Sequence, residues 1–322
     1  MRSILRTILI SIITYTTGSG IALAESYPEH PIKMIVPYPP GSGTDTIARY
    51  FAKGLEEEVS QPIVVENRPG GNAIIAAQAV ARSKPDGYTL LWAANGPVTT
   101  NVAMHKSLPY DPLVDLIPVA RVALSPMGFY VPADSQFETV DELFEYAKEH
   151  PGELNAGSGS ATYNIATEWL LSHADAEVEI INYSGSAPAI LAASTGEIDF
   201  TIVEYSAALS LVESGKLKLL AMTTDERFHA EPDKPTLQEL GYGDFLQVAW
   251  WGVFAPKDTP IEIVNTLEDL FLGFCTSDEA KNWLEKNDFS QFCASKEELG
   301  EFQESEINRE VGLVQRFNIP QI

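Results

Sequence analysis

Three stretches of this sequence join small and hydroxyl-bearing residues to the start of a predicted helix. They are residues 39–45, 155–162 and 183–188. Backbone N–H groups at a helix N-terminus carry a partial positive charge, which suits an anionic oxygen. A carboxylate bound there would gain charge-assisted hydrogen bonds of about 1.5–3 kcal/mol each. One such loop is common, but three in corresponding places predict joint binding of a small anion.

The first loop, Pro-Pro-Gly-Ser-Gly-Thr-Asp, is the most distinctive. It follows an apolar run at residues 32–36 and precedes an amphipathic run at 46–59, so we expect a strand, a tight loop and a helix in succession. Its prolines fix the backbone angle φ, and its glycines can adopt φ values that other residues avoid, so the loop can turn sharply. Thr44 or Asp45 is predicted to cap the helix.

Other kinds of site fit these loops less well. The first loop lacks the Gly-Lys-Ser/Thr of a phosphate-binding loop, and Thr46 takes the place of the third glycine of a dinucleotide-binding loop. The sequence has no Gly-x-Ser-x-Gly elbow, and its five histidines show no metal-ligand spacing. We therefore expect no catalytic residue, no metal and no cofactor. The alternative is a hydrolase or transferase that uses a serine of the second or third loop, without a paired base.

Strand-like and helix-like segments alternate along most of the chain, which predicts parallel sheets covered by helices. The first unit has predicted strands at 32–36, 63–66 and 89–93 and helices at 46–59 and 72–83. The second has strands at 178–182, 197–203 and 217–223, helices at 139–149, 162–172, 187–194 and 207–214, and a Gly/Ser loop at 155–160. Helices at 260–274, 277–286 and 296–316 close the chain. Thr139 and Glu142 form a predicted capping box.

Two long apolar runs without helical period, at 116–131 and 245–255, separate these units. We interpret them as extended crossings between two α/β lobes, one formed by residues 25–125 with 250–322 and the other by residues 126–249. Ligands of open α/β sheets lie beyond the carboxyl ends of the strands, so the three loops would line a cleft between the lobes. Trp250 and Trp251 lie on the return crossing, where either both pack in the core or one of them forms a cleft wall.

The first 24 residues have the features of a cleaved secretory signal peptide. Arg2 and Arg6 supply the positive start, residues 8–13 lie in the apolar centre, and Ala22-Leu23-Ala24 is a small-x-small cleavage site. The apolar part is about ten residues long, too short to span a bilayer. We therefore expect export to the periplasm rather than a membrane anchor.

The chain is strongly acidic, with 45 Asp and Glu residues against 21 Lys and Arg and a formal net charge of −24. Such a surface repels nucleic acid and anionic membranes, so neither is an expected partner. Net charge does not exclude an anionic ligand, because local donors set the potential inside a cleft.

The two cysteines, Cys275 and Cys293, would reach an oxidising compartment after export. A disulfide between them would close a loop of about 18 residues and stabilise the fold by roughly 3 kcal/mol. Two free, buried thiols are the alternative, because the sequence does not show whether the Cα atoms approach closely enough.

Short segments along nearly the whole mature chain carry a family resemblance. They are 27–28 with 31–32, 37–45, 64–70, 85–90, 108–112, 183–189, 215–217, 251–252 with 255–256, and 259–260. In their order and spacing the chain resembles the periplasmic solute-binding proteins of tripartite tricarboxylate transporters, the Bug or TctC family. The resemblance implies a two-lobed type II periplasmic-binding fold, capture of a small organic acid and delivery to a two-subunit membrane transporter. It also implies a monomer without enzymatic activity. A receptor that presents its ligand to a membrane signalling kinase is the alternative, since its binding chemistry would be the same.

The resemblance also implies which residues hold the ligand. The family's first contact, made partly through ordered water, corresponds to Pro40, Gly41, Ser42, Thr44 and Asp45. The contacts of the second lobe correspond to Ser158, Ser160, Thr162, Tyr183, Ser184, Gly185, Ser186, Ala187 and Pro188. Asp45 is expected to cap its helix or to orient the loop and its water, rather than to contact an anion.

Several positions depart from the family pattern, and they concern the ligand. Ser184 stands where a basic residue is frequent, and Asn164 lies near the place of a frequent histidine. Val203 and Glu204 stand where Asp and Asn are frequent. We infer a pocket for a monocarboxylate, or for a less charged or more apolar solute than a dicarboxylate.

Overall fold

One long strand, β4 (Leu116–Pro132), belongs to both halves of the molecule. In the computed structural model, which describes residues 27–243 and 245–322, its residues 116–126 pair antiparallel with β9 (Val248–Pro256). Its residues 127–132 pair antiparallel with β7 (Phe200–Glu204) and β8 (Leu217–Met222). The predicted signal peptide, residues 1–24, lies outside the described residues.

The part of the sheet that contains β9 and residues 116–126 of β4 is called the N-terminal sheet below, and it contains the first three predicted strands. β1 (Ile32–Val36) lies between β2 (Ile63–Asn67) and β3 (Thr89–Ala94) and is parallel to both. β3 pairs antiparallel with β9, and β10 (Ser290–Ala294) pairs antiparallel with β4. The helices of this half are α1 (Gly43–Val59), α2 (Ile74–Ala81), α3 (Asn101–Met104), α8 (Ile261–Cys275), α9 (Asp278–Lys286) and α10 (Lys296–Arg316), with a π-helical turn η1 (Gly96–Thr100).

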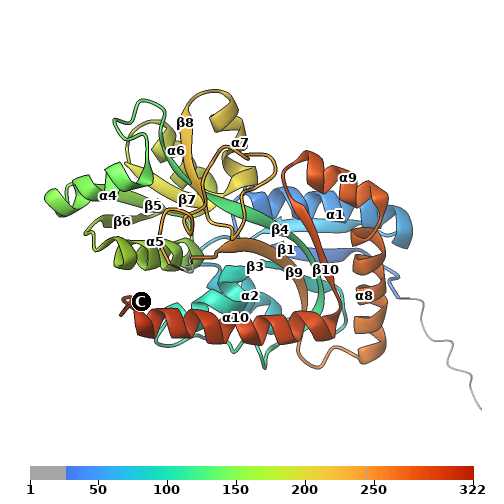
Figure 1. Cartoon of the computed structure of the whole chain (residues 1–322). Coiled ribbons are helices and arrows are strands. Elements are labelled where there is room, and N and C mark those ends of the chain that lie inside the picture. Colours follow the sequence, from blue (N-terminus) through green and yellow to red (C-terminus); the bar gives the residue numbers. More distant parts are fainter. Residues whose placement is uncertain (1–26, 244) are drawn as a thin grey trace, which may run out of the picture.

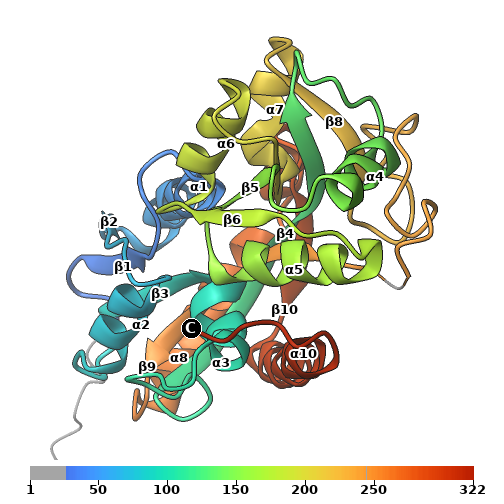
Figure 2. The same cartoon turned by 90° about the vertical axis from the view of Figure 1, so that its left-hand side faces the viewer.

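The sheet on the other side, called the middle sheet, is built from the central part of the chain. β5 (Asn155–Ser158) lies between β6 (Glu179–Asn182) and β7 and is parallel to both. Its helices are α4 (Val140–Glu149), α5 (Ala161–Ala174), α6 (Ser186–Ser194) and α7 (Tyr205–Glu213). The strands described form the order β2-β1-β3-β9-β4-β7-β5-β6, with β8 and β10 attached to β4 (Figure 1). In Figure 2 the elements of the middle sheet gather in the upper part of the view, and α10 lies below them.

Residue spacing explains how the site-bearing elements pack. The buried apolar residues of α1 are Ile47, Ala48, Phe51, Ala52 and Leu55. They recur at three- and four-residue intervals and therefore share one helix face. Phe51 of this face packs on Trp92 of β3, with ring centroids 5.2 Å apart. Met34, Ile35 and Val36 of β1 are all buried, as expected for a parallel strand covered on both faces. This packing fixes the loop between β1 and α1.

One predicted loop is a strand. The sequence predicts a Gly/Ser loop at residues 155–160, but Asn155–Ser158 is β5, inside the middle sheet. The prediction was wrong because pairing on both sides overrides the weak strand preference of small residues. Small residues are needed here, since a Cβ on Gly157 would lie 2.2 Å from Ile198 Cδ1. The sequence also did not predict β10, η1 or α3.

Helix α4 begins as predicted, but its capping box is incomplete. Thr139 is the N-cap, and its Oγ1 accepts a hydrogen bond from the Glu142 N–H at 3.1 Å. The Glu142 carboxylate accepts from the N–H of Glu138 at 2.8 Å rather than from Thr139, so this half of the prediction was wrong. The complete reciprocal pair occurs at α10, between Ser295 and Glu298.

A disulfide joins Cys275, the last residue of α8, to Cys293 in β10. Their Cα atoms lie 6.1 Å apart, so the bridge fastens β10 to the helix that precedes α9. Within residues 27–243 and 245–322, none of the helices combines the length and apolar character that crossing a membrane requires.

Candidate functional site

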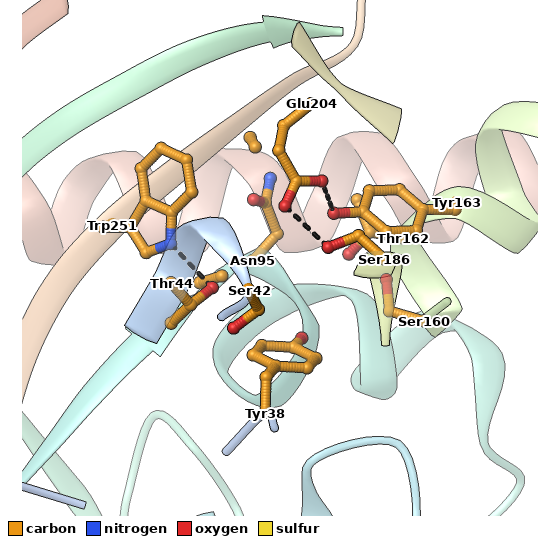
Figure 3. Close-up of a pocket in the computed structure, with 12 residues that line it drawn as sticks. Tyr38, Ser42, Thr44, Asn95, Ser160, Thr162, Tyr163, Ser186, Glu204 and Trp251 are labelled. Carbon is orange, nitrogen blue, oxygen red and sulfur yellow. Dashed lines mark hydrogen bonds between the residues drawn. The ribbon is translucent and has the colours of Figure 1, made fainter. Parts of the chain in front are cut away.

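A small cavity lies where β3 and β7 end and where α1, α5 and α6 begin (Figure 3). It is lined by Tyr38, Ser42, Thr44, Ala94, Asn95, Ser160, Thr162, Tyr163, Ser186, Glu204, Ala249 and Trp251. The space left between these side chains is about 10 Å³, room for roughly one water molecule. The carboxyl ends of the strands are the place where ligands of open α/β sheets bind.

The first loop brings Ser42 and Thr44 to this cavity. Ser42 is the N-cap of α1, and its Oγ accepts a hydrogen bond from the Asp45 N–H at 3.2 Å. The prediction that Thr44 or Asp45 caps the helix was wrong, because the helix begins at Gly43 rather than at Thr46. The N-terminus of α1 therefore lies closer to the cavity than the sequence indicates.

Thr44 is hydrogen-bonded to a tryptophan of β9. Its Oγ1 accepts a hydrogen bond from Trp251 Nε1 at 2.9 Å (Figure 3). Trp251 thus forms one wall of the cavity, whereas Trp250 is buried and packs with its ring edge-on to Phe302. Both tryptophans are buried, and one of them, Trp251, forms a wall of the cavity.

Asp45 does not line the cavity but holds the first loop in place. Its Oδ2 accepts hydrogen bonds from the Gly41 N–H and from Arg49 Nε, both at 3.0 Å. Its Oδ1 accepts from Asn67 Nδ2 at 2.8 Å. Burial opposes ionisation of Asp45, but the hydrogen bonds from Arg49, Gly41 and Asn67 outweigh it and hold the pKa of this carboxyl below its usual range. The carboxylate therefore orients the loop.

The second loop contributes Ser160 and Thr162 at the start of α5. Thr162 Oγ1 lies 2.9 Å from Thr100 Oγ1 of η1, and the Thr100 hydroxyl donates to Glu310 Oε1 of α10 at 3.1 Å. Because Thr100 gives its hydrogen to Glu310, Thr162 is the donor to Thr100. These buried hydroxyls connect a helix of the middle sheet to the helices of the N-terminal sheet.

The third loop contributes Ser186, the first residue of α6. Its hydroxyl donates to Glu204 Oε1 at 2.9 Å, and the Tyr163 hydroxyl of α5 donates to Glu204 Oε2 (Figure 3). Glu204 is the last residue of β7 and is 2% exposed. A Cβ placed on Gly43 would lie 3.0 Å from Glu204 Oε1, so this oxygen also reaches the first turn of α1.

Two tyrosines of the cavity stay protonated over the physiological range. Burial, and then the neighbouring Glu204, raise the pKa of both Tyr38 and Tyr163 well above the ordinary value. Their hydroxyls are therefore hydrogen-bond donors. The described residues that line the cavity include no Lys, Arg or His.

The structure brings together five of the predicted binding residues, namely Ser42, Thr44, Ser160, Thr162 and Ser186. The others do not line this cavity, and they are Pro40, Gly41, Asp45, Ser158, Tyr183, Ser184, Gly185, Ala187 and Pro188. Tyr183 and Ser184 line a neighbouring hollow of about 280 Å³. Ser158 uses its hydroxyl to donate to the Ser160 carbonyl at 2.9 Å. A Cβ on Gly185 would lie 3.1 Å from Pro39 Cδ, so the first and third loops touch.

Four polar residues of the cavity, Tyr38, Asn95, Tyr163 and Glu204, were not among the predicted binding residues, although Glu204 was noticed as a departure from the family pattern. Asn95 directly follows β3, and Glu204 ends β7, so the rule that ligands lie at the carboxyl ends of strands would have found both. Tyr38 lies within the segment that carries the resemblance. For Tyr163 the sequence holds no such signal, because its orientation depends on where α5 packs.

The sequence matches, over residues 47–319, the family described as "Tripartite tricarboxylate transporter family receptor". The chain belongs to this family. Protein BugT of Bordetella pertussis is 36% identical to it over 265 residues, which cover 80% of this chain and 81% of BugT. The resemblance found in the sequence is thereby confirmed.

Solved structures of the receptor family have the same fold. The R. palustris protein Rpa4515 with adipate has 30% sequence identity and a TM-score of 0.89, covering 92% of this chain and all of that one. MatC (Rpa3494) from Rhodopseudomonas palustris with bound malate has 27% identity and a TM-score of 0.85, covering 89% of this chain and 100% of that one. The predicted two-lobed periplasmic-binding fold is confirmed.

The receptor family binds small carboxylates, and the geometry described here suits hydrogen bonding to oxygen atoms. Hydroxyl groups from the first turns of three helices meet in one buried space, with two tyrosine hydroxyls beside them. These hydroxyl groups can donate charge-assisted hydrogen bonds to a ligand carboxylate, so the protein needs no Lys or Arg side chain there.

Proposed function

We propose that this receptor captures a small organic acid between its two lobes in the periplasm and delivers it, as a monomer, to a two-subunit tripartite tricarboxylate-type membrane transporter. The observation that carries the proposal is the meeting of Ser42, Ser160 and Ser186 in one cavity. These residues come from the starts of α1, α5 and α6, so three partial positive charges point toward the same space. Thr44 and Thr162 add hydroxyls beside them.

Membership of the receptor family supports the choice of ligand class and of transporter. The proteins Rpa4515 and MatC were solved with adipate and malate, both of which are dicarboxylates. From these proteins we infer only the class of ligand, a small carboxylic acid. The number of its charged groups is inferred from the residues of this chain.

Binding requires the lobes to move apart and close again, because the cavity holds only about 10 Å³. β4 and β9 are the segments that pair along the boundary between the lobes, and a hinge at such elements is the usual mode of closure around a ligand. The exchange of β4 partners between Pro126 and Met127, and the start of β9 at Val248, support lobes formed by residues 25–125 with 250–322 and by residues 126–249.

We also propose that residues 1–24 direct export and are then removed. The basic start and the Ala-Leu-Ala site support this processing. The mature receptor would begin at Glu25.

Native mass spectrometry of gently purified mature protein, followed by denaturing release of bound molecules, tests the proposal. We expect one protein chain with a small organic acid that is released on unfolding, and the released mass names the solute. Purified protein that carries no small molecule, and whose thermal unfolding is unchanged by any carboxylic acid at millimolar concentration, would contradict it.

A further inference from the structure

The carboxyl group of Glu204 is the only acidic group among the described residues that line the cavity. It is 2% exposed, and both of its oxygens face groups that donate hydrogen bonds. Ser186 donates to one oxygen and Tyr163 to the other, and the oxygen bonded to Ser186 also lies beside the first turn of α1 at Gly43. Figure 3 shows this carboxyl pointing into the space between Ser186 and Tyr163.

This arrangement places a carboxyl of the protein where three predicted anion-binding loops converge. The Ser186 hydroxyl at the start of α6, a donor that a ligand carboxylate would use, already bonds to Glu204. A second carboxylate at the same place would meet a like charge in a site removed from water, which is strongly unfavourable.

The cavity also lacks a charge that would balance Glu204. No Lys, Arg or His occurs among its described lining residues, and the two tyrosines keep their protons. Buried acidic side chains are rare unless they are paired, so a partner of positive charge is expected. A ligand that enters this space is the group able to supply it.

We propose that Glu204 selects a ligand that carries a positively charged amino group together with its carboxylate, so that the solute of this receptor is an amino acid rather than a dicarboxylate. This inference rests on the function proposed above. The amino group forms a charge-assisted hydrogen bond with Glu204, and the ligand carboxylate accepts hydrogen bonds from the hydroxyl groups of Ser42, Thr44 and Ser160. Glu204 is then a specificity-determining residue.

Chain-length-matched ligands test this assignment. Titration calorimetry of the mature protein would compare succinate, glutarate and adipate with the unbranched amino acids of four, five and six carbons, with the amino group at carbon 2 or at the far end. The corresponding unbranched fatty acids report on the carboxylate alone. We expect an amino acid of one length to bind at least about tenfold more tightly than the dicarboxylate and the fatty acid of that length.

Replacement of Glu204 supplies the decisive comparison. Glu204→Gln keeps the shape and removes the charge, so we expect amino acid affinity to fall by about tenfold or more and dicarboxylate affinity to rise. Glu179→Gln, an exposed position in β6, changes net charge equally and is expected to leave both affinities unchanged. Circular dichroism and thermal unfolding show whether each variant is folded.

The outcomes separate the two proposals. Tight binding of a dicarboxylate or of a fatty acid by the unaltered protein, in preference to the amino acids, overturns the role of Glu204 and leaves the receptor function standing. Equal loss of affinity in the Glu204 and Glu179 variants also overturns it. Failure of the protein to bind any acid of the three classes overturns the role of Glu204, and it contradicts the receptor function as well only if native mass spectrometry also finds no bound small molecule.

Discussion

The hydroxyl oxygen of Thr100 in η1 lies 2.9 Å from that of Thr162 in α5, which joins the two halves of the molecule beside the cavity. Both side chains are buried, at 0% and 3% exposure. The same Thr100 hydroxyl donates to Glu310 Oε1, so a single small side chain links the cavity to the long helix α10.

Thr100→Val is therefore expected to destabilise the protein. The substitution keeps the volume but leaves Glu310 and Thr162 without this partner, and a buried polar group that loses its hydrogen bond costs about 1–3 kcal/mol. Urea denaturation measures the loss. Thr266→Val is the matched control, because its exposed hydroxyl bonds only to the carbonyl of Glu262 in its own helix. Equal stability of the two variants would contradict a structural role for Thr100.

Glu310 makes the stability of the protein depend on pH near neutrality. Burial raises the pKa of Glu310 to about 7, against the opposing attraction of Arg309. Because the folded state holds this proton more tightly than the unfolded state, the contribution is complete below pH 4.5 and is lost as the pH rises through 7. It amounts to about 3 kcal/mol.

Glu310→Gln should remove this pH dependence. The amide is neutral at every pH, so the variant is expected to be more stable than the original protein at pH 8 and to show a flatter stability profile between pH 5 and 8. Thermal unfolding at several pH values checks this, with the exposed Glu304→Gln as control. A larger stability difference at pH 5 than at pH 8 would contradict the expectation.

Gly159→Ala should separate the second and third loops. A Cβ at this position would lie 2.4 Å from the Gly185 carbonyl carbon and 2.6 Å from the Ser186 nitrogen, and backbone atoms cannot move aside easily. We expect a stability loss of about 1–3 kcal/mol and weaker ligand binding. Gly273→Ala in α8 meets nothing within 4 Å and should be neutral or slightly stabilising. Calorimetric unfolding and ligand titration compare the two, and indistinguishable results would refute the close approach.

Loss of the disulfide should lower stability without changing the ligand. The bridge closes a loop of sequence separation 18, and on the loop-entropy account its removal costs roughly 3 kcal/mol. Cys275→Ser with Cys293→Ser, measured against the oxidised parent in guanidinium chloride, gives the difference. Since neither cysteine lines the cavity, ligand affinity should stay within about twofold of the parent's at a temperature where both are folded. A large change in affinity would show that β10 influences the site.

The order of strands and helices followed from apolar periodicity, because most elements here bury one clear face or are buried throughout. The exact bounds of α10 at Lys296–Arg316 match the predicted helix, where a capping box and amphipathic spacing agree. β5 could not be predicted, because its Asn-Ala-Gly-Ser sequence becomes a strand only through its neighbours β6 and β7. Local sequence does not encode such tertiary pairing.

The candidate site was predicted at the level of its loops and less well at the level of side chains. Ser42, Ser160 and Ser186 reach the cavity because helix starts fix them there. Glu204 was noticed as a departure from the family pattern, but its position between two helix N-termini follows from the packing of β7 beside α1 and α6. Only the three-dimensional arrangement shows that this carboxyl and the loops occupy one space.

β9 lies between β3 and β4 in the N-terminal sheet, yet it comes from residues 248–256. During synthesis, every strand of the middle sheet, including the part of β4 that it uses, has emerged by residue 222, whereas β3 and the first part of β4 still lack the strand that separates them. The middle sheet can therefore assemble first, whereas the N-terminal sheet is complete only after β9 and the last third of the chain have been synthesised. A chain cut short after the middle sheet would present two unpaired strand edges, the usual starting point of aggregation.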